Sequence, residues 1–323
     1  MPKTDPRESV AEVHFPMPKL HLKPYRHQSS FRRIASVAWD PPRDPTIYGS
    51  MEVRADRLLE WIDLKRRETG ERITITHAVA RAVALALAKH PDLNAVVKWN
   101  GLHLRRDVDV FLQVAIPKEN GSSGQADLSG TCVRLADTKD IATICREVRA
   151  SAKKLRAHED KEFQKTKAQA DMLPIPIFKR VLGLIQWLQY ELGISTEFLG
   201  APTDPFGSAM VTSLGMFGIK VAYAPFFPPA RTPMIILVGA CEDTPVAEDG
   251  AVVVRKVLTL NATFDHRVID GYHGALISRE VKRMLEFPRL LEEEGERDHL
   301  IGHSDQTTEL ETLDLNPPTQ DLA

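Results

Sequence analysis

The sequence predicts a mixed α/β protein in which one large β-sheet is covered by helices. Segments with the alternating pattern of strands and segments with helical spacing are interspersed along the whole chain. The last third is rich in apolar and β-branched runs that suit an extended sheet. The composition, with 43% apolar and 27% charged residues among 323, is normal for a globular protein with a sizeable core.

The first half of the chain alternates between strand and helix patterns. Three segments have the character of strands: residues 46–54, 108–116 and 131–135. Three others have helical spacing: residues 55–68, a segment from Thr74 or Thr76 to about His90, and residues 138–155. Gly70 and Pro91 end the first two of these helices. The second helix is rich in alanine and leucine on all sides, so we expect it to be buried.

A segment at about residues 156–205 differs from its surroundings. A run rich in lysine and glutamate leads through a proline-containing stretch into an amphipathic helix. The apolar positions of this helix are Val181, Leu182, Leu184, Ile185, Leu188 and Leu192. Three arrangements fit the pattern: a helix packed on the body of the protein, a lid over a substrate channel, or a helix on a membrane surface.

The last third predicts three strands and a final helix. The strands are residues 208–213, 234–241 and 251–263, with a hairpin turn at 248–250, and the helix covers residues 271–285. Residues 1–29 are expected to form an irregular arm. Residues 291–323 contain ten acidic residues and one basic residue, Arg297, so we expect an acidic, disordered tail.

Composition argues against several classes of protein. The net charge of −2 gives no global basic field for nucleic acid, although the chain before the acidic tail is mildly basic and suits an anionic ligand. Cys132, Cys145 and Cys241 form no disulfide or zinc pattern, which favours a reducing, cytoplasmic location. The proline-rich residues 1–23 are unlike a signal peptide, and no apolar run is long enough for a membrane span.

His266 and Asp270 are the candidate chemical groups. Histidine titrates near neutral pH and is the usual general base. His266 follows an apolar run and lies between Asp265 and Arg267, an arrangement that is costly unless the site is open or paired. Asp270 suits a cap before a helix. A lone histidine is more often structural than catalytic, and a metal pair lacks a third ligand with suitable spacing.

Residues 265–271 (Asp-His-Arg-Val-Ile-Asp-Gly) resemble the active-site signature of the acyltransferase (E2) components of 2-oxo acid dehydrogenase complexes. Further blocks resemble this family in the same order along the chain: residues 30–36, 82–95, 211–218, and 225–229 with 234–239. The resemblance covers about residues 30–290, which we expect to form one catalytic domain containing the extra segment. It implies the two-layer fold shared with chloramphenicol acetyltransferase, a large mixed sheet covered by helices.

The resemblance implies CoA-dependent acyl transfer to a lipoyl-type thiol or a small molecule. His266 would be the general base, and the hydroxyl of Thr212 would stabilise the oxyanion. Asp270 would support the site through hydrogen bonds. An alternative of another class is a non-catalytic assembly protein that keeps the fold.

Four neighbouring residues receive secondary roles. Ser213 is the less favoured oxyanion donor and, with Gly215, a candidate for substrate contact. Arg267 is expected to be a structural ion-pair partner, and Gly271 is expected to permit a tight turn into the helix. No metal is expected at the site.

The resemblance also implies partners. It predicts a homotrimer in which the histidine and the hydroxyl of one site come from different chains, with CoA or acyl-CoA as substrate and no tightly bound cofactor. About 30 residues precede the first matching block, so we expect no lipoyl group on this chain and a separate lipoyl-carrying protein as a candidate partner. The segment at 156–205 is expected to set the choice of acceptor.

Overall fold

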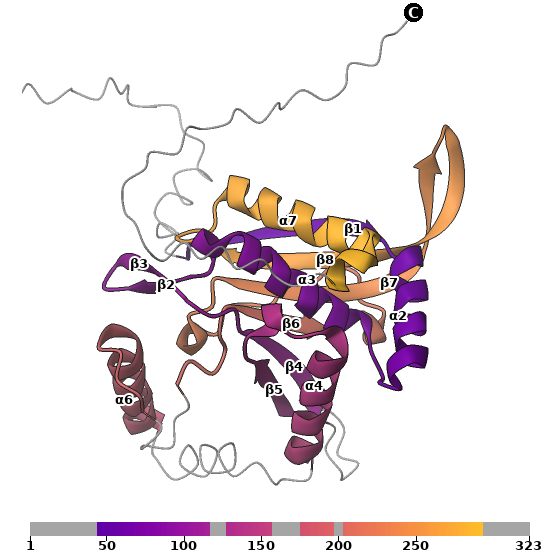
Figure 1. Ribbon diagram of the computed structural model, residues 1–323. Coiled ribbons are helices and arrows are strands. Elements are labelled where there is room, and N and C mark those ends of the chain that lie inside the picture. Colours follow the sequence, from indigo (N-terminus) through magenta and orange to yellow (C-terminus); the bar gives the residue numbers. More distant parts are fainter. Residues whose placement is uncertain (1–43, 117–126, 157–174, 197–202, 293–323) are drawn as a thin grey trace, which may run out of the picture. The chain divides into compact units, whose positions relative to one another are not determined.

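The computed structural model describes residues 44–116, 127–156, 175–196 and 203–292 (Figure 1). The chain divides into two units, residues 1–44 and 45–323, and the described helices and strands all lie in the second. The expected N-terminal arm and residues 293–323 of the expected tail lie outside the described residues.

A six-stranded mixed sheet forms the centre of the second unit. Its order is β1-β8-β7-β6-β4-β5. The strands are β1 (Thr46–Arg54), β4 (Val110–Ile116), β5 (Asp127–Val133), β6 (Ala209–Ser213), β7 (Met234–Glu248) and β8 (Ala251–Asp265). Strand β6 runs parallel to both β4 and β7, and the other pairs are antiparallel. The expected mixed sheet is therefore confirmed.

Four helices pack on one face of this sheet (Figure 1). They are α2 (Asp56–Thr69), α3 (Ile75–Lys89), α4 (Ile141–Arg156) and α7 (Gly271–Glu286). Alternate strand residues such as Val211 and Ile236 point toward the helices and form the core with them. Ten consecutive residues of α3, from Ala78 to Leu87, are buried, as its composition predicted.

Local signals set most element boundaries. Gly70 adopts a left-handed conformation with φ of 71° and ends α2. Asp249 and Gly250 both have positive φ and join β7 to β8 in the expected hairpin. Helix α4 begins later than Thr138, because Asp140 accepts a hydrogen bond from the backbone of Thr143 at 2.7 Å and caps the helix there.

A small hairpin that was not predicted from the sequence follows α3. Strands β2 (Ala95–Lys98) and β3 (Gly101–Leu104) pair through a turn at Trp99 and Asn100, both with positive φ. Strands of four residues are too short for alternation to stand out.

The apolar stripe of the extra segment is only partly covered in the single chain. Helix α6 (Ile175–Gln186) continues into a π-helical turn, Trp187–Glu191. Leu184 is 55% exposed, and Val181 and Leu192 are also exposed. Trp99 contacts the π-helical turn that follows α6. Its indole N–H donates a hydrogen bond to the carbonyl of Glu191 at 2.8 Å. The segment is therefore anchored at its C-terminal end, and Leu182, Ile185 and Leu188 of its stripe are partly buried.

None of the described helices is long and apolar enough to cross a membrane.

The start of α3 contains a histidine that must stay neutral. The Nδ1 atom of His77 accepts a hydrogen bond from the backbone N–H of Thr74 at 3.0 Å. Burial lowers the pKa of His77 to about 4. Protonation would convert Nδ1 into a donor and break this cap.

We therefore expect the free energy of unfolding to fall as pH decreases from 7 to 4. The unfolded state binds a proton near pH 6.5 and the folded state near 4, so the loss is on the order of 3 kcal/mol. Denaturant titrations across this range measure it. His77→Gln, which keeps an acceptor at the capping position, should flatten the curve, whereas His103→Gln on exposed β3 should not. An unchanged slope in His77→Gln would contradict the assignment.

Candidate active site

His266 occupies an open position immediately after the last residue of β8. Its backbone N–H donates to the carbonyl of Pro45 at 2.8 Å, and the N–H of Asp265 donates to Pro233 at 2.9 Å. The side chain is exposed, and its ring makes no hydrogen bond with any residue that the structure describes. The backbone is thus fixed while the imidazole stays accessible to a ligand.

Arg267 is held by its neighbour. Its guanidinium forms a two-pronged ion pair with the carboxylate of Asp265, with a shortest distance of 2.6 Å between Nη2 and Oδ2. The hydrogen bond to Asp265 raises the pKa of Arg267. This pair satisfies the carboxylate of the largely buried Asp265.

Asp270 caps helix α7. Its Oδ1 atom accepts a hydrogen bond from the backbone N–H of His273 at 2.9 Å. This backbone hydrogen bond lowers the pKa of Asp270, with smaller contributions from the charges of His273 and His266. Val268 and Ile269 are buried between the two ends of the turn. An ionised carboxylate is therefore fixed close to His266.

Gly271 was expected to permit a tight turn into the helix, and this expectation is wrong. Its φ lies outside the left-handed region, and a Cβ atom there would meet nothing within 4 Å. The turn therefore does not require glycine at this position. Asp270 alone supplies the cap that begins the helix.

Thr212 lies on β6 with its side chain directed away from the helices. Its neighbours Val211 and Ser213 point to the helix-covered face, because successive strand residues alternate between faces. Thr212 is half-buried. The hydroxyls of Thr212 and Ser213 therefore lie on opposite faces of the sheet.

One chain does not bring Thr212 and His266 together. Thr212 pairs with Leu237 of β7, which pairs with Asn261 of β8, whereas His266 lies beyond the end of β8. A rise of ~3.3 Å per residue and a spacing of ~4.8 Å between strands put the two Cα atoms roughly 20 Å apart. Thr212 lies near the C-terminal end of β6, whereas His266 lies level with the N-terminal end of that strand.

Ser213 and Gly215 line a groove of about 350 Å³ beside the start of α3. A Cβ atom on Gly215 would lie 2.4 Å from the carbonyl oxygen of Gly239, so only glycine allows this close approach of the two backbones. Cys241 lines the same groove, and burial raises the pKa of its thiol. The groove therefore offers a hydroxyl and backbone groups, with its cysteine kept protonated.

Other chemical groups are poor candidates for catalysis. Within residues 44–116, 127–156, 175–196 and 203–292, no cluster of histidine, cysteine and carboxylate side chains could hold a metal ion. Burial raises the pKa of Cys132 to about 11, so its thiol is not a nucleophile near neutral pH.

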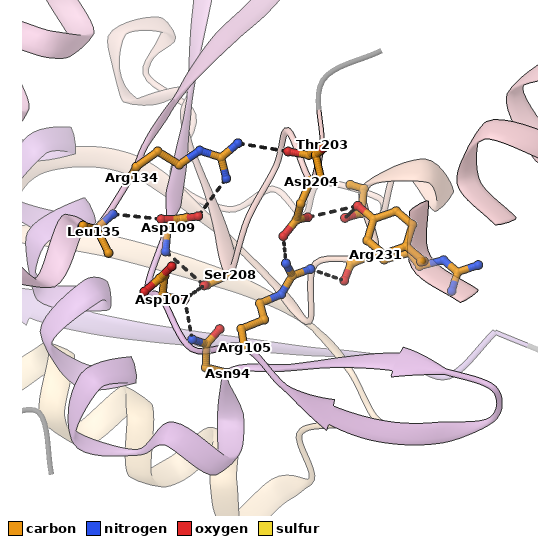
Figure 2. A network of polar contacts seen from close by, with 12 residues as sticks. Asn94, Arg105, Asp107, Asp109, Arg134, Leu135, Thr203, Asp204, Ser208 and Arg231 are labelled. Carbon is orange, nitrogen blue, oxygen red and sulfur yellow. Dashed lines mark hydrogen bonds and ion pairs between the residues drawn. The ribbon is translucent and has the colours of Figure 1, made fainter. Parts of the chain in front are cut away.

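A polar network that was not predicted from the sequence joins the extra segment to the body of the protein (Figure 2). The largely buried Arg105 forms an ion pair with Asp204, which also accepts a hydrogen bond from the hydroxyl of Tyr190 at 3.1 Å. Arg134 bridges Asp109 and the carbonyl of Thr203. The cluster of charges from residue 105 to 109 was the available signal, but its partners lie far along the chain.

This network lies at the end of the sheet where β4 and β6 begin, and His266 follows β8 at the same end. The N–H of Ser208, just before β6, donates to the carbonyl of Asp109 at 2.8 Å. Met210, next to the start of β6, pairs with Ile235, and Met234 pairs with Phe264 near the end of β8. Two strand spacings, ~10 Å in all, therefore separate the start of β6 from the end of β8.

A family model for the 2-oxoacid dehydrogenases acyltransferase (catalytic domain) matches residues 42–168 and 205–292. The residues between the two matches fall inside the extra segment. The dihydrolipoyllysine-residue acetyltransferase component of the acetoin cleaving system of Bacillus subtilis (strain 168) is 28% identical over 222 residues, covering 69% of this chain and 44% of that protein. The corresponding component of the pyruvate dehydrogenase complex of Zymomonas mobilis is 27% identical over 251 residues, covering 76% and 45%. The chain spans less than half the length of each relative.

Solved structures share the fold. A probable dihydrolipoamide acetyltransferase from Listeria monocytogenes 4b F2365 superimposes with a TM-score of 0.54 and 20% identity, covering 79% of this chain and 88% of that one. The cubic core of the pyruvate dehydrogenase multienzyme complex gives 0.57 and 19%, covering 78% and 85%. The fold class expected from the sequence is confirmed.

Proposed function

Because the chain belongs to the 2-oxoacid dehydrogenase acyltransferase family through its catalytic-domain region, we propose that it transfers acyl groups between CoA and an acceptor, with His266 as general base. The observation that carries the proposal is the setting of His266. Its backbone is fixed on the end of β8, its ring is open to a ligand, and the carboxylate of Asp270 is held nearby.

The proposed reaction balances as a simple exchange of thioesters. His266 takes the proton from the attacking thiol, and the resulting thiolate adds to the carbonyl carbon of the acyl donor. The carbonyl oxygen becomes an oxyanion, which the hydroxyl of Thr212 stabilises by donating a hydrogen bond. Collapse of this intermediate expels the second thiolate, which recovers the proton from the His266 imidazolium. Asp270 acts as a positioning residue that supports the site through hydrogen bonds, as its cap of α7 holds the turn that carries His266.

We propose that the site is shared between subunits of a homotrimer. A separation of roughly 20 Å is far beyond the reach of two groups that act on one thioester, since each must lie within about 3 Å of the reacting atoms. A second copy of the chain can supply the missing hydroxyl. This geometry supports the trimer that the family resemblance implies.

The proposed acceptor is a lipoyl-type thiol carried by another protein, with a small molecule as the second possibility. The names of the two bacterial relatives support the first. The extra segment is anchored through Glu191, Tyr190 and Asp204 at the end of the sheet where His266 lies. From there it would shape the entrance for the acceptor. Release of CoA from a panel of acyl-CoA donors, compared for dihydrolipoamide, small alcohols and small amines, would identify the acceptor.

Mixing two inactive variants tests the shared site. After subunit exchange in equal amounts, His266→Ala and Thr212→Ala chains should regain about one quarter of wild-type CoA release, the fraction of heterologous interfaces that receive both intact residues. Sedimentation should give a species near three times 36.2 kDa. Mixing His266→Ala with the double variant His266→Ala/Thr212→Ala is the matched control and should give none. If exchanged trimers stay inactive, both residues act within one chain.

A further inference from the structure

A groove that the proposed acyl-transfer site does not use lies between α2 and the C-terminal end of α7. Its volume is about 810 Å³. The apolar lining includes Trp61 and Leu64 of α2, together with Phe287 and Leu290, which follow α7. Leu64 is 44% exposed and Phe287 is 52% exposed. Large apolar side chains gathered in one exposed groove mark an interaction site more often than chance exposure.

Arginine residues surround this apolar lining. Arg57, Arg67, Arg283 and Arg289 contribute to the groove, whereas Glu60 is the one acidic residue among the described residues that line it. Arg57 stacks over the ring of Phe287 at 5.2 Å. Arg57 and Arg67 form no ion pair with any residue in the described part of the chain. The groove therefore suits a ligand that is both apolar and acidic.

The last described residues of the chain lie at this groove. The short helix η7 (Pro288–Glu292) contributes Leu290 to the groove. Glu292 is fixed there, because its carboxylate accepts a hydrogen bond from Trp61 at 2.9 Å and pairs with Lys65 at 2.8 Å. Residues 293–323 thus begin beside the groove.

One segment of these residues has matching chemistry. Residues 309–315 (Glu-Leu-Glu-Thr-Leu-Asp-Leu) interleave three acidic side chains with three leucines. Sixteen residues separate them from Glu292. Sixteen residues can span at most about 50 Å when fully extended, so the chain is long enough for the segment to reach the groove.

We propose that residues 309–315 dock into this groove of their own chain. The leucines bury apolar surface against the exposed Leu64 and Phe287, and the carboxylates form charge-assisted hydrogen bonds with Arg57 and Arg67. The short linker gives the segment an effective concentration in the millimolar range, which favours the same chain over a second copy.

Cleavage of the full chain by a protease specific for glutamate tests the docking. Arg57→Glu with Arg67→Glu should speed cleavage after Glu309 and Glu311 by about tenfold, since docking protects these bonds. Leu313→Ser should act in the same direction without altering the folded body. Lys153→Glu with Lys154→Glu, on the exposed surface of α4, is the matched charge control and should leave the rate unchanged. Equal rates in all variants overturn the proposal.

A disulfide experiment distinguishes the occupants. Oxidation of the full chain carrying Leu64→Cys and Leu313→Cys should link residues 64 and 313 within one chain, so the denatured mass stays at 36.2 kDa. The pair Lys154→Cys and Leu313→Cys should not link. A product of twice the mass would assign the groove to a second copy, and the absence of any link between residues 64 and 313 would leave the segment undocked. Either result contradicts docking within the chain.

Discussion

We expect His266→Ala to lower the rate of CoA release by about 10² to 10⁴, the usual contribution of a general base. The attacking thiol would have to ionise without a positioned acceptor for its proton. The side chain is exposed, and its ring bonds to no described residue, so its removal leaves no cavity and no unpaired buried group. The melting temperature should therefore match that of the wild type.

The matched control is His103→Ala, which removes an exposed histidine from β3. It should leave the rate of CoA release unchanged. Rates are measured at saturating acyl-CoA, so that loss of donor binding does not imitate loss of chemistry. A folded His266→Ala protein with full activity would remove the histidine from the mechanism.

Features that depend on neighbouring residues could be predicted from the sequence. Strand β1 has the predicted bounds, Thr46–Arg54, because alternation along nine residues is a strong periodic signal. Gly70 ends α2, and the first turn of α3 is capped at Thr74, since both depend on the backbone within a few residues. The turn from Asp265 to Asp270 is equally local, and its residues were the ones singled out.

Features that depend on distant partners could not be predicted in this way. Arg105 meets Asp204 about a hundred residues later, and no pattern near either residue names the other. Gly215 is required because the carbonyl of Gly239 lies against it, a contact that exists only once β6 and β7 are neighbours. The roughly 20 Å between Thr212 and His266 likewise follows from strand order and register.

The amphipathic helix α6 illustrates a third case. Its sequence predicts an apolar stripe, but not what covers that stripe. Leu184 remains 55% exposed, whereas Leu182, Ile185 and Leu188 are partly buried, so the described part of this chain covers only one side of the stripe. Periodicity identifies a surface that can be buried, and only assembly decides where burial happens.

The second large effect is expected for the loss of the hydroxyl that stabilises the oxyanion. Thr212→Ala should lower turnover by about 10² to 10³, the usual cost of losing one hydrogen-bond donor to an oxyanion. The Michaelis constant for acyl-CoA should change little, because the negative charge develops on the carbonyl oxygen only near the transition state. Thr212→Ser keeps the hydroxyl and should keep much of the activity.

Ser213→Ala is the matched control, because strand alternation directs its hydroxyl to the opposite face of the sheet, into the groove beside α3. This variant loses one hydroxyl from the adjacent position and should retain near-normal turnover. If Ser213→Ala is the damaging change and Thr212→Ala is mild, the oxyanion donor is one residue further along β6. The reacting carbonyl would then lie on the helix-covered side, and a site formed with a second chain across the other face would be ruled out.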